Sequence, residues 1–321
     1  MIKSLGSFRA ALLGGWVALG GAGVLYARIK NIPGWAALPV VAAFLVAYPF
    51  YLVPAFREWR ERLAGVWLGA YVVAAAVLPY LACCCGGVSF ELGSFFRLLA
   101  MGLVFAIWYV VFPPAALVDL AFLVLIPTVL LGGYFQPVYV PRLAGLKDLI
   151  FLGHVTLISI TVMVLMRIRR VPDFGFGFVP ERKAWQVGGL HFLYFVPVGL
   201  PLALLLRAAH FVRPAHLWML PVNFLGFLWV GALSEEFFFR GVLQQWLEEW
   251  TGSRTAALLA ASGSFGLVHI GFRPGFPNWR WVLIATVLGL FCGRARNLTG
   301  SIQAGMITHA LVFATWRAFF A

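Results

Sequence analysis

The chain of 321 residues is 62% hydrophobic and only 11% charged, which excludes a soluble domain of this size. Its apolar runs are continuous rather than alternating, and this favours membrane-spanning helices over a barrel. The formal net charge of +13 does not indicate a nucleic-acid partner, because Lys and Arg form short clusters beside the apolar runs, where they act as topology signals and contact anionic lipid headgroups. We therefore predict an all-α, polytopic transmembrane helical bundle with membrane lipids as partners.

Apolar windows between charged or Pro/Gly breaks predict about eleven spans, within a range of about nine to thirteen, since each needs roughly 20 apolar residues. The run that follows Lys3 and Arg9 continues to Tyr26 with no small-residue cleavage site, so we expect a retained first helix rather than a signal peptide. The predicted spans are 8–27, 35–54, 63–84, 95–113, 116–134, 148–167, 187–206, 217–247, 254–272, 279–295 and 300–320.

The densest group of basic residues between spans predicts the topology. It consists of Arg167, Arg169, Arg170, Arg182 and Lys183. The positive-inside rule places this group in the cytoplasm, and counting spans backwards from it also places the N-terminus inside. We expect an integral protein of a prokaryotic cytoplasmic (inner) membrane.

The loop 168–186, which is rich in Pro and Gly, separates two halves of different character. Ionisable residues within predicted spans are sparse before it and concentrated after it. We predict an N-terminal transmembrane accessory module over residues 1–170 and a C-terminal domain over residues 187–321. The motifs of that domain lie within 217–321.

The segment Ser234–Gly241 places two carboxylates and a guanidinium in an otherwise apolar helix. Such groups are expensive in a bilayer, so they indicate a functional or tightly paired site. Glu236 and Arg240 are four residues apart and are expected to form an ion pair on one helix face. Glu235 points about 100° away from its neighbour and is the leading candidate for a general base that activates water. The alternative is a purely structural ion-pair network between helices.

Two histidines follow on later predicted spans, His269 and His309, each among small residues that allow close helix approach. Singly, each is typical of a hydrogen-bonded packing histidine. Together with Glu235 they form a possible Glu/His/His cluster. This cluster supports either a divalent metal such as zinc or metal-free general acid/base hydrolysis.

The depths of these residues do not match along straight spans. Glu235 lies about 18 residues, or roughly 27 Å, from the outer end of its predicted span, whereas His269 lies near the outer end of the next. A bend in the long 217–247 segment at Gly226 or Gly231 would bring the two together.

The series Glu-Glu-x-x-x-Arg at 235–240, Phe265-x-x-x-His269 and a terminal-helix His309 resembles the CPBP (CAAX protease and bacteriocin-processing) family of intramembrane proteases. The resemblance covers residues 217–321, with three motifs in the right order on adjacent spans. Phe265 belongs to the second motif and is expected to support the site.

This resemblance implies hydrolysis of a peptide bond within or near the membrane. Glu235 would activate the water, and Glu236 and Arg240 would hold the helix. His269 and His309 would position the water or stabilise the tetrahedral oxyanion. The family has been described both as metalloproteases and as metal-free glutamate proteases, so a zinc ion on Glu235, His269 and His309 stays open.

One residue departs from the family pattern. The family usually has Asn or Asp four residues after the terminal histidine, whereas this chain has Phe313. Loss of one oxyanion donor lowers a rate by roughly 10² to 10³. Asn223, Ser264 and Thr308 are the candidates for a substitute donor.

Three functions follow from these patterns. The first is an endopeptidase that cleaves a peptide or protein substrate with a membrane-associated tail, such as a CAAX-like, leader or C-terminal sorting tail, with 1–170 recruiting or gating the substrate. The second is a catalytically altered scaffold or sensor on the same fold, suggested by Phe313. The third is a proton-coupled transporter that uses buried Glu and His residues, although no paired repeats support it.

Overall fold

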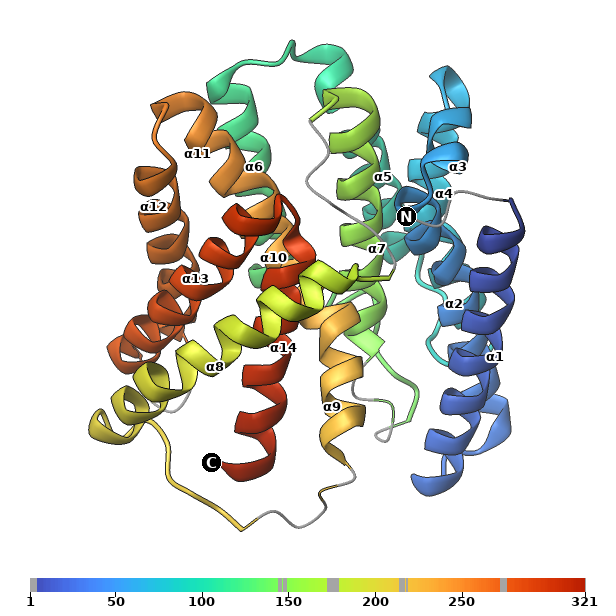
Figure 1. Cartoon of the computed structure of the whole chain (residues 1–321). Helices are drawn as coiled ribbons and strands as arrows, with labels where there is room; N and C mark the ends of the chain where they lie inside the picture. Colours follow the sequence, from blue (N-terminus) through green and yellow to red (C-terminus); the bar gives the residue numbers. More distant parts are fainter. Residues whose placement is uncertain are drawn as a thin grey trace. The chain divides into compact units, whose positions relative to one another are not determined.

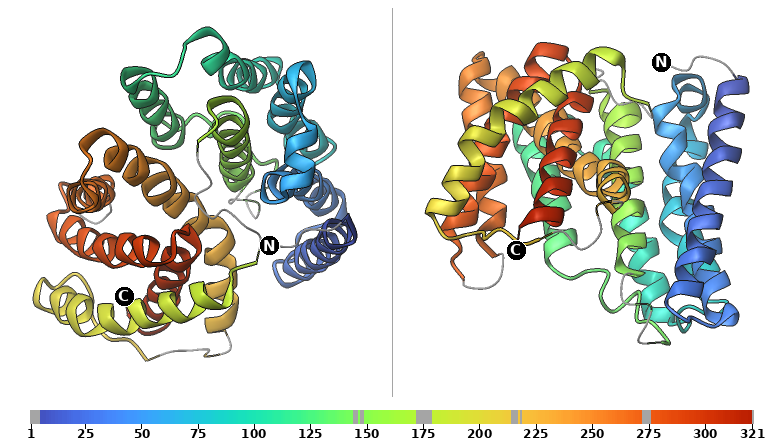
Figure 2. Two further views of the ribbon diagram at one scale, coloured as in Figure 1. Left: turned by 45° about the horizontal axis from the view of Figure 1, so that its top comes forward. Right: turned by 60° about the horizontal axis from the view of Figure 1, so that its bottom comes forward.

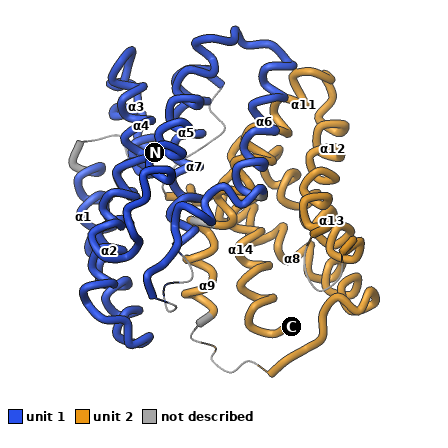
Figure 3. Tube along the Cα trace, turned by 180° about the vertical axis from the view of Figure 1, so that it is seen from behind, with its two compact units in different colours: residues 1–172 blue, residues 173–321 orange. Residues whose placement is uncertain are grey.

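A computed structural model describes residues 5–143, 146, 149–171, 179–213, 217, 219–271 and 276–320. These residues form helices and two isolated bridges but no strand, so the predicted all-α class is confirmed. The chain divides into two compact units, 1–172 and 173–321 (Figure 3). Residues 172–178 of the predicted loop lie outside the described residues. The assignment of an accessory module and a functional domain stays a prediction.

Unit 1 arranges its helices around α7 (Figures 1 and 2). The helix α7 packs against α2, α4 and α5 and its apolar window is 72% buried, whereas that of α1 is only 6% buried. The helices are α1 (Leu5–Ile29), α2 (Gly34–Leu52), α3 (Arg57–Arg62), α4 (Gly65–Cys83), α5 (Leu92–Val111), α6 (Ala116–Leu131) and α7 (Ile150–Val164), which continues as the π-helical turn Leu165–Arg169. The exposed apolar surface of α1 is what a lipid-facing helix requires.

One buried carboxylate ties three elements of unit 1 together. Asp119 on α6 is 1% exposed and accepts hydrogen bonds from Nε and Nη2 of Arg169 at 2.8 and 2.7 Å. The Tyr109 hydroxyl on α5 donates to the same carboxylate at 2.9 Å. The charged Asp119 carboxylate in the apolar helix α6 is therefore explained by a structural role, because Arg169 pairs with both of its oxygens.

Unit 2 contains a long segment, α9 to α11, that runs past α14 and reaches α12 (Figure 1). The segment is helical throughout, but two π-helical stretches, Leu228–Ala232 and Phe237–Leu243, interrupt its α-helical geometry. The helices are α8 (Arg182–Leu205), α9 (Met219–Phe227), α10 (Leu233–Glu236), α11 (Gln244–Thr251), α12 (Arg254–Leu267), α13 (Trp279–Thr299) and α14 (Ile302–Phe319). Contacts of α13 with α8, α12 and α14 place it at the centre of the unit.

Helix lies in each of the eleven predicted windows, but fewer helices satisfy the requirements for crossing a membrane. In the described part of the chain, seven are long and apolar enough by length and composition. They are Ser7–Ile29, Gly34–Ala55, Gly65–Cys83, Leu92–Val111, Ile150–Arg169, Arg182–Leu205 and Trp279–Thr299, and Ala116–Leu130 is a shorter apolar helix. The windows 217–247, 254–272 and 300–320 fall outside this set, and these windows carry Glu235, His269 and His309.

Candidate active site

The centre of the site is a buried ion pair on the segment α10 to α11. The Arg240 guanidinium donates from Nη1 to Oε1 of Glu236 at 3.0 Å, and both side chains are 0% exposed. The predicted pair is therefore confirmed. Each of the two charges needs the other, because removing one partner would leave the other charged and unpaired in an apolar interior.

His309 on α14 joins this pair to the second carboxylate. Its Nδ1 lies 3.1 Å from Oε1 of Glu236, and its Nε2 lies 3.7 Å from Oε2 of Glu235. In the tautomer that donates Nδ1–H to Glu236, Nε2 carries the lone pair and faces Glu235. Glu236 thus orients the imidazole toward the neighbouring glutamate.

The two adjacent glutamates have different environments. The Glu236 side chain is 0% exposed and ion-paired, whereas that of Glu235 is 35% exposed. This difference matches the predicted division between a paired and an unpaired carboxylate. Glu235 is the one with access to solvent or substrate.

Phe265 on α12 connects the two histidines. Its buried ring has centroid distances of 4.8 Å to the ring of His269 and 5.5 Å to that of His309. The guanidinium carbon of Arg240 lies 4.4 Å from the same ring centroid, which is within the range of a cation–π contact. Phe265 therefore holds the buried cation against the helix that carries His269.

His269 lies in the 3₁₀ turn Val268–Gly271 that ends α12. Its Nδ1 is 2.7 Å from the carbonyl oxygen of Phe265, the residue whose ring also contacts His309. His269 and His309 therefore share a neighbour, and Gly231, one of the two predicted bend sites, lies in the π-helical stretch Leu228–Ala232.

The zinc alternative requires ligands grouped around one metal position. Within the described ranges, no three His, Cys, Asp or Glu side chains are grouped so that they could hold a metal ion. The Nδ1 atoms of His269 and His309 are in hydrogen bonds, to Phe265 and Glu236, as in histidines that bind a metal through Nε2. Glu235, His269 and His309 nevertheless do not group as a three-ligand site in the part of the chain that the structure describes.

Sequence reasoning missed Gln244, which lies one turn beyond Arg240. Its amide nitrogen donates to Oδ1 of Asn297 on α13 at 2.9 Å. Glu236, Arg240 and Gln244 thus form a polar stripe with a spacing of four residues. That spacing was the signal in the sequence that would have found Gln244.

Glycines on the facing helices make room for this stripe. A Cβ on Gly305 would lie 2.5 Å from Oε2 of Glu236, and a Cβ on Gly289 would lie 3.1 Å from Nη2 of Arg240. A Cβ on Gly293 would lie 2.7 Å from Oε1 of Gln244. The close approach of α13 and α14 to the polar stripe therefore requires glycine at these positions.

Phe313, the departure from the family pattern, stacks on Phe227 with a centroid distance of 3.8 Å and an interplanar angle of 9°. Phe227 in turn packs edge-on against His309 at 5.2 Å. Thr308 donates its hydroxyl to the carbonyl oxygen of Gly188 or Ala304, so its proton is already engaged. Asn223 and Ser264 stay the candidates for a substitute donor.

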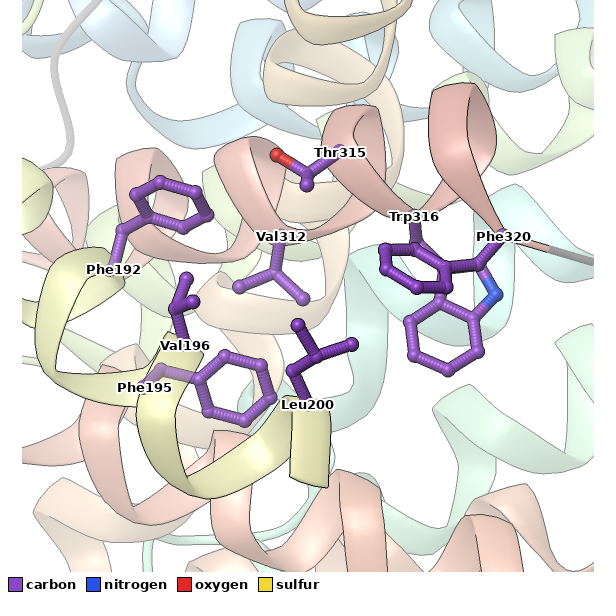
Figure 4. A pocket seen from close by; sticks show the side chains of 8 residues that line it. All are labelled: Phe192, Phe195, Val196, Leu200, Val312, Thr315, Trp316 and Phe320. Carbon is purple, nitrogen blue, oxygen red and sulfur yellow. The ribbon is translucent and has the colours of Figure 1, made fainter. Parts of the chain in front are cut away.

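A small apolar cavity of about 40 Å³ lies between α8 and α14 (Figure 4). Val312 and Trp316, which follow His309 on α14, form one wall, and Phe195 on α8 forms part of the other. Val312 also packs against the core cluster that contains Phe265. The surroundings of His309 are therefore apolar on this side.

Comparison with known proteins identifies the segment that contains this site. Searches of curated proteins and of solved structures returned no match. Residues 217–315 match the family model Rce1-like, described as type II CAAX prenyl endopeptidase Rce1-like. The resemblance that the motifs indicate is therefore confirmed, and the segment 217–315 of this membrane protein, which holds Glu235, His269 and His309, is similar to the Rce1-like CAAX prenyl endopeptidase family.

Proposed function

We propose that this protein is an intramembrane endopeptidase that hydrolyses a peptide bond of a membrane-presented substrate with water activated by Glu235. The observation that carries the proposal is the position of the accessible Glu235 carboxylate, 3.7 Å from Nε2 of His309. The family match over residues 217–315 supports the protease class.

The geometry supports a general-base mechanism. Water held between Glu235 and His309 gives one proton to the Glu235 carboxylate while its oxygen bonds to the scissile carbonyl carbon. The carbonyl π electrons move to the oxygen and form a tetrahedral oxyanion. Collapse of the oxyanion breaks the carbon–nitrogen bond, and the leaving amine takes the proton from Glu235. His309 accepts a hydrogen bond from the attacking water, and Glu236 fixes the ring in the orientation that this requires.

The substrate class follows from the location of the site. Glu235 lies in a segment packed among helices of a membrane protein, so a substrate must bring its scissile bond to the membrane. A peptide tail tethered to the membrane satisfies this condition, and the family description names CAAX prenyl substrates. A leader peptide or a C-terminal sorting tail fits the same geometry.

The replacement His309→Ala is expected to lower cleavage by at least about 10²-fold, because the attacking water loses the group that orients it. The protein should be reconstituted in liposomes with a panel of tethered peptides, with and without a C-terminal isoprenoid, and products should be identified by mass spectrometry. His154→Ala in unit 1 is the control, since it removes a histidine from a helix remote in sequence. Equal cleavage by both variants would refute the role of His309.

Phe313 favours a second function, a non-catalytic scaffold or sensor on the same fold. Its stacked ring occupies the position where the family usually carries an amide or carboxyl group. If the protein is a protease, we expect Phe313→Asn to change its rate by no more than the effect of one oxyanion donor, roughly 10² to 10³-fold. Cleavage by Phe313→Asn where the parent protein cleaves nothing in the same panel would establish the second function.

A further inference from the structure

Several buried polar atoms along the polar stripe have no hydrogen-bond partner among the described residues. They are Oε2 of Glu236, Nε and Nη2 of Arg240 and Oε1 of Gln244, together with Oγ of Ser262 on α12. Glu236 and Arg240 are 0% exposed, and Gln244 and Ser262 are each 1% exposed. Leaving such a group unsatisfied costs about 1 to 3 kcal/mol, and ordered water is the usual partner for groups of this kind.

These atoms lie along one helix interface rather than scattered through the unit. At Gly289 a Cβ would lie 3.1 Å from Nη2 of Arg240 and 3.0 Å from Cβ of Ser262, so both side chains border the same glycine. One turn further along α13, a Cβ at Gly293 would lie 2.7 Å from Oε1 of Gln244. A guanidinium donor, an amide acceptor and a hydroxyl that can act as both therefore border α13 at these two glycines, and together they supply the two to four polar partners that a buried water needs.

The same interface continues to an open polar cavity. Asn297, which accepts from Gln244, also accepts from Nη1 of Arg296 at 3.2 Å. Arg296 pairs with Glu248 at 3.2 Å, and Asn297, Arg296 and Glu248 line a cavity of about 360 Å³. A succession of polar side chains therefore leads from this cavity to Arg240. The stripe then continues through Glu236 and His309 to Glu235, whose Oε2 faces His309 at 3.7 Å and has no hydrogen-bond partner among the described residues.

We infer that ordered water molecules occupy the interface between α13 and the stripe Arg240–Gln244, and that they connect the polar cavity with the candidate active site. Peptide hydrolysis consumes one water in each turnover, and lipid around the bundle supplies none. The interface meets this need by admitting water where the substrate does not enter. This supply role rests on the proposed function, whereas the water sites themselves do not.

The water sites are tested directly by an experimental structure of the whole protein at a resolution that shows ordered solvent. We expect solvent density within about 3.2 Å of Nη2 of Arg240, of Oε1 of Gln244 and of Oγ of Ser262. The inference is overturned if these atoms instead bond directly to one another with no solvent between them. This outcome is independent of whether the protein cleaves any peptide.

The supply role is tested by Gln244→Met, which keeps the approximate volume and removes the amide. We expect kcat to fall by about tenfold, as the loss of one hydrogen-bonded water site implies, with KM unchanged. The polar variant Gln244→Glu should restore part of the rate. Gly293→Ala should also lower kcat, whereas Gly263→Ala, where a Cβ meets nothing within 4 Å, should not.

Melting temperatures of all four variants separate slower cleavage from unfolding. A folded Gln244→Met variant with the parent kcat would overturn the supply role even if the protein is a protease. A parent protein that shows ordered water at the interface but cleaves no peptide would instead refute the proposed function and leave the water sites in place.

Discussion

Replacement of Glu235 by Gln is expected to lower peptide cleavage by about 10² to 10⁴-fold, the usual contribution of a general base. Glutamine has nearly the same shape and fits the same partly exposed position, but its amide does not take a proton from water. Glu235 has no ion pair with Arg240, which is engaged by Glu236, so we expect the melting temperature to stay near that of the parent protein. Initial cleavage rates in liposomes and thermal unfolding in detergent measure the two effects.

Glu58→Gln is the matched control, because it makes the same chemical change at an exposed position on α3 in unit 1, outside the candidate site. Its cleavage rate should equal that of the parent protein. Persistent cleavage by Glu235→Gln at the rate of this control would show that another group activates the water, and the proposed mechanism would then be wrong.

Replacement of Arg240 by Met is expected to lower the free energy of unfolding by about 3 to 5 kcal/mol, since the buried Glu236 carboxylate loses the guanidinium that pairs with it. Glu236 would be left charged at 0% exposure, and the face of Phe265 would lose its cation. The double replacement Glu236→Met with Arg240→Met should recover much of this stability, because neither charge is then buried. It should not recover cleavage, since His309 would lack the carboxylate that orients it.

The control for this series is Arg254→Met. Arg254 also pairs with a glutamate, Glu248 at 2.7 Å, but its side chain is 77% exposed, and exposed pairs contribute at most about 1 kcal/mol. Unfolding in increasing denaturant compares the variants. If Arg240→Met and Arg254→Met lose the same stability, the buried pair does not support the unit as proposed.

The sequence was sufficient to predict the helices and the ion pair, because both depend on local patterns. Apolar runs bounded by charged or turn residues predicted helix in every window, and four-residue spacing predicted that Glu236 meets Arg240. The motifs also singled out His309. Which nitrogen of that histidine meets which glutamate depends on tertiary packing between residues more than 70 positions apart, and no local pattern contains it.

The register between helices was also beyond the sequence. Nothing in the sequence indicates that Gly289 and Gly293 face Arg240 and Gln244. The sequence also did not show which helices satisfy the criteria for a span. Seven helices of the described residues meet the length and composition of a membrane span, and the segments that carry Glu235, His269 and His309 are not among them.

The π-helical stretch Leu228–Ala232 has a consequence for the phase of the helix. On an ideal α-helix, Phe227 and Glu236 would lie on roughly opposite faces, yet both contact His309. A π-helical stretch accommodates one extra residue and thereby rotates all later side chains by about 100°. Deleting a single residue there would turn Glu236 away from His309. The contact between these two side chains would be lost although every residue of the site is still present.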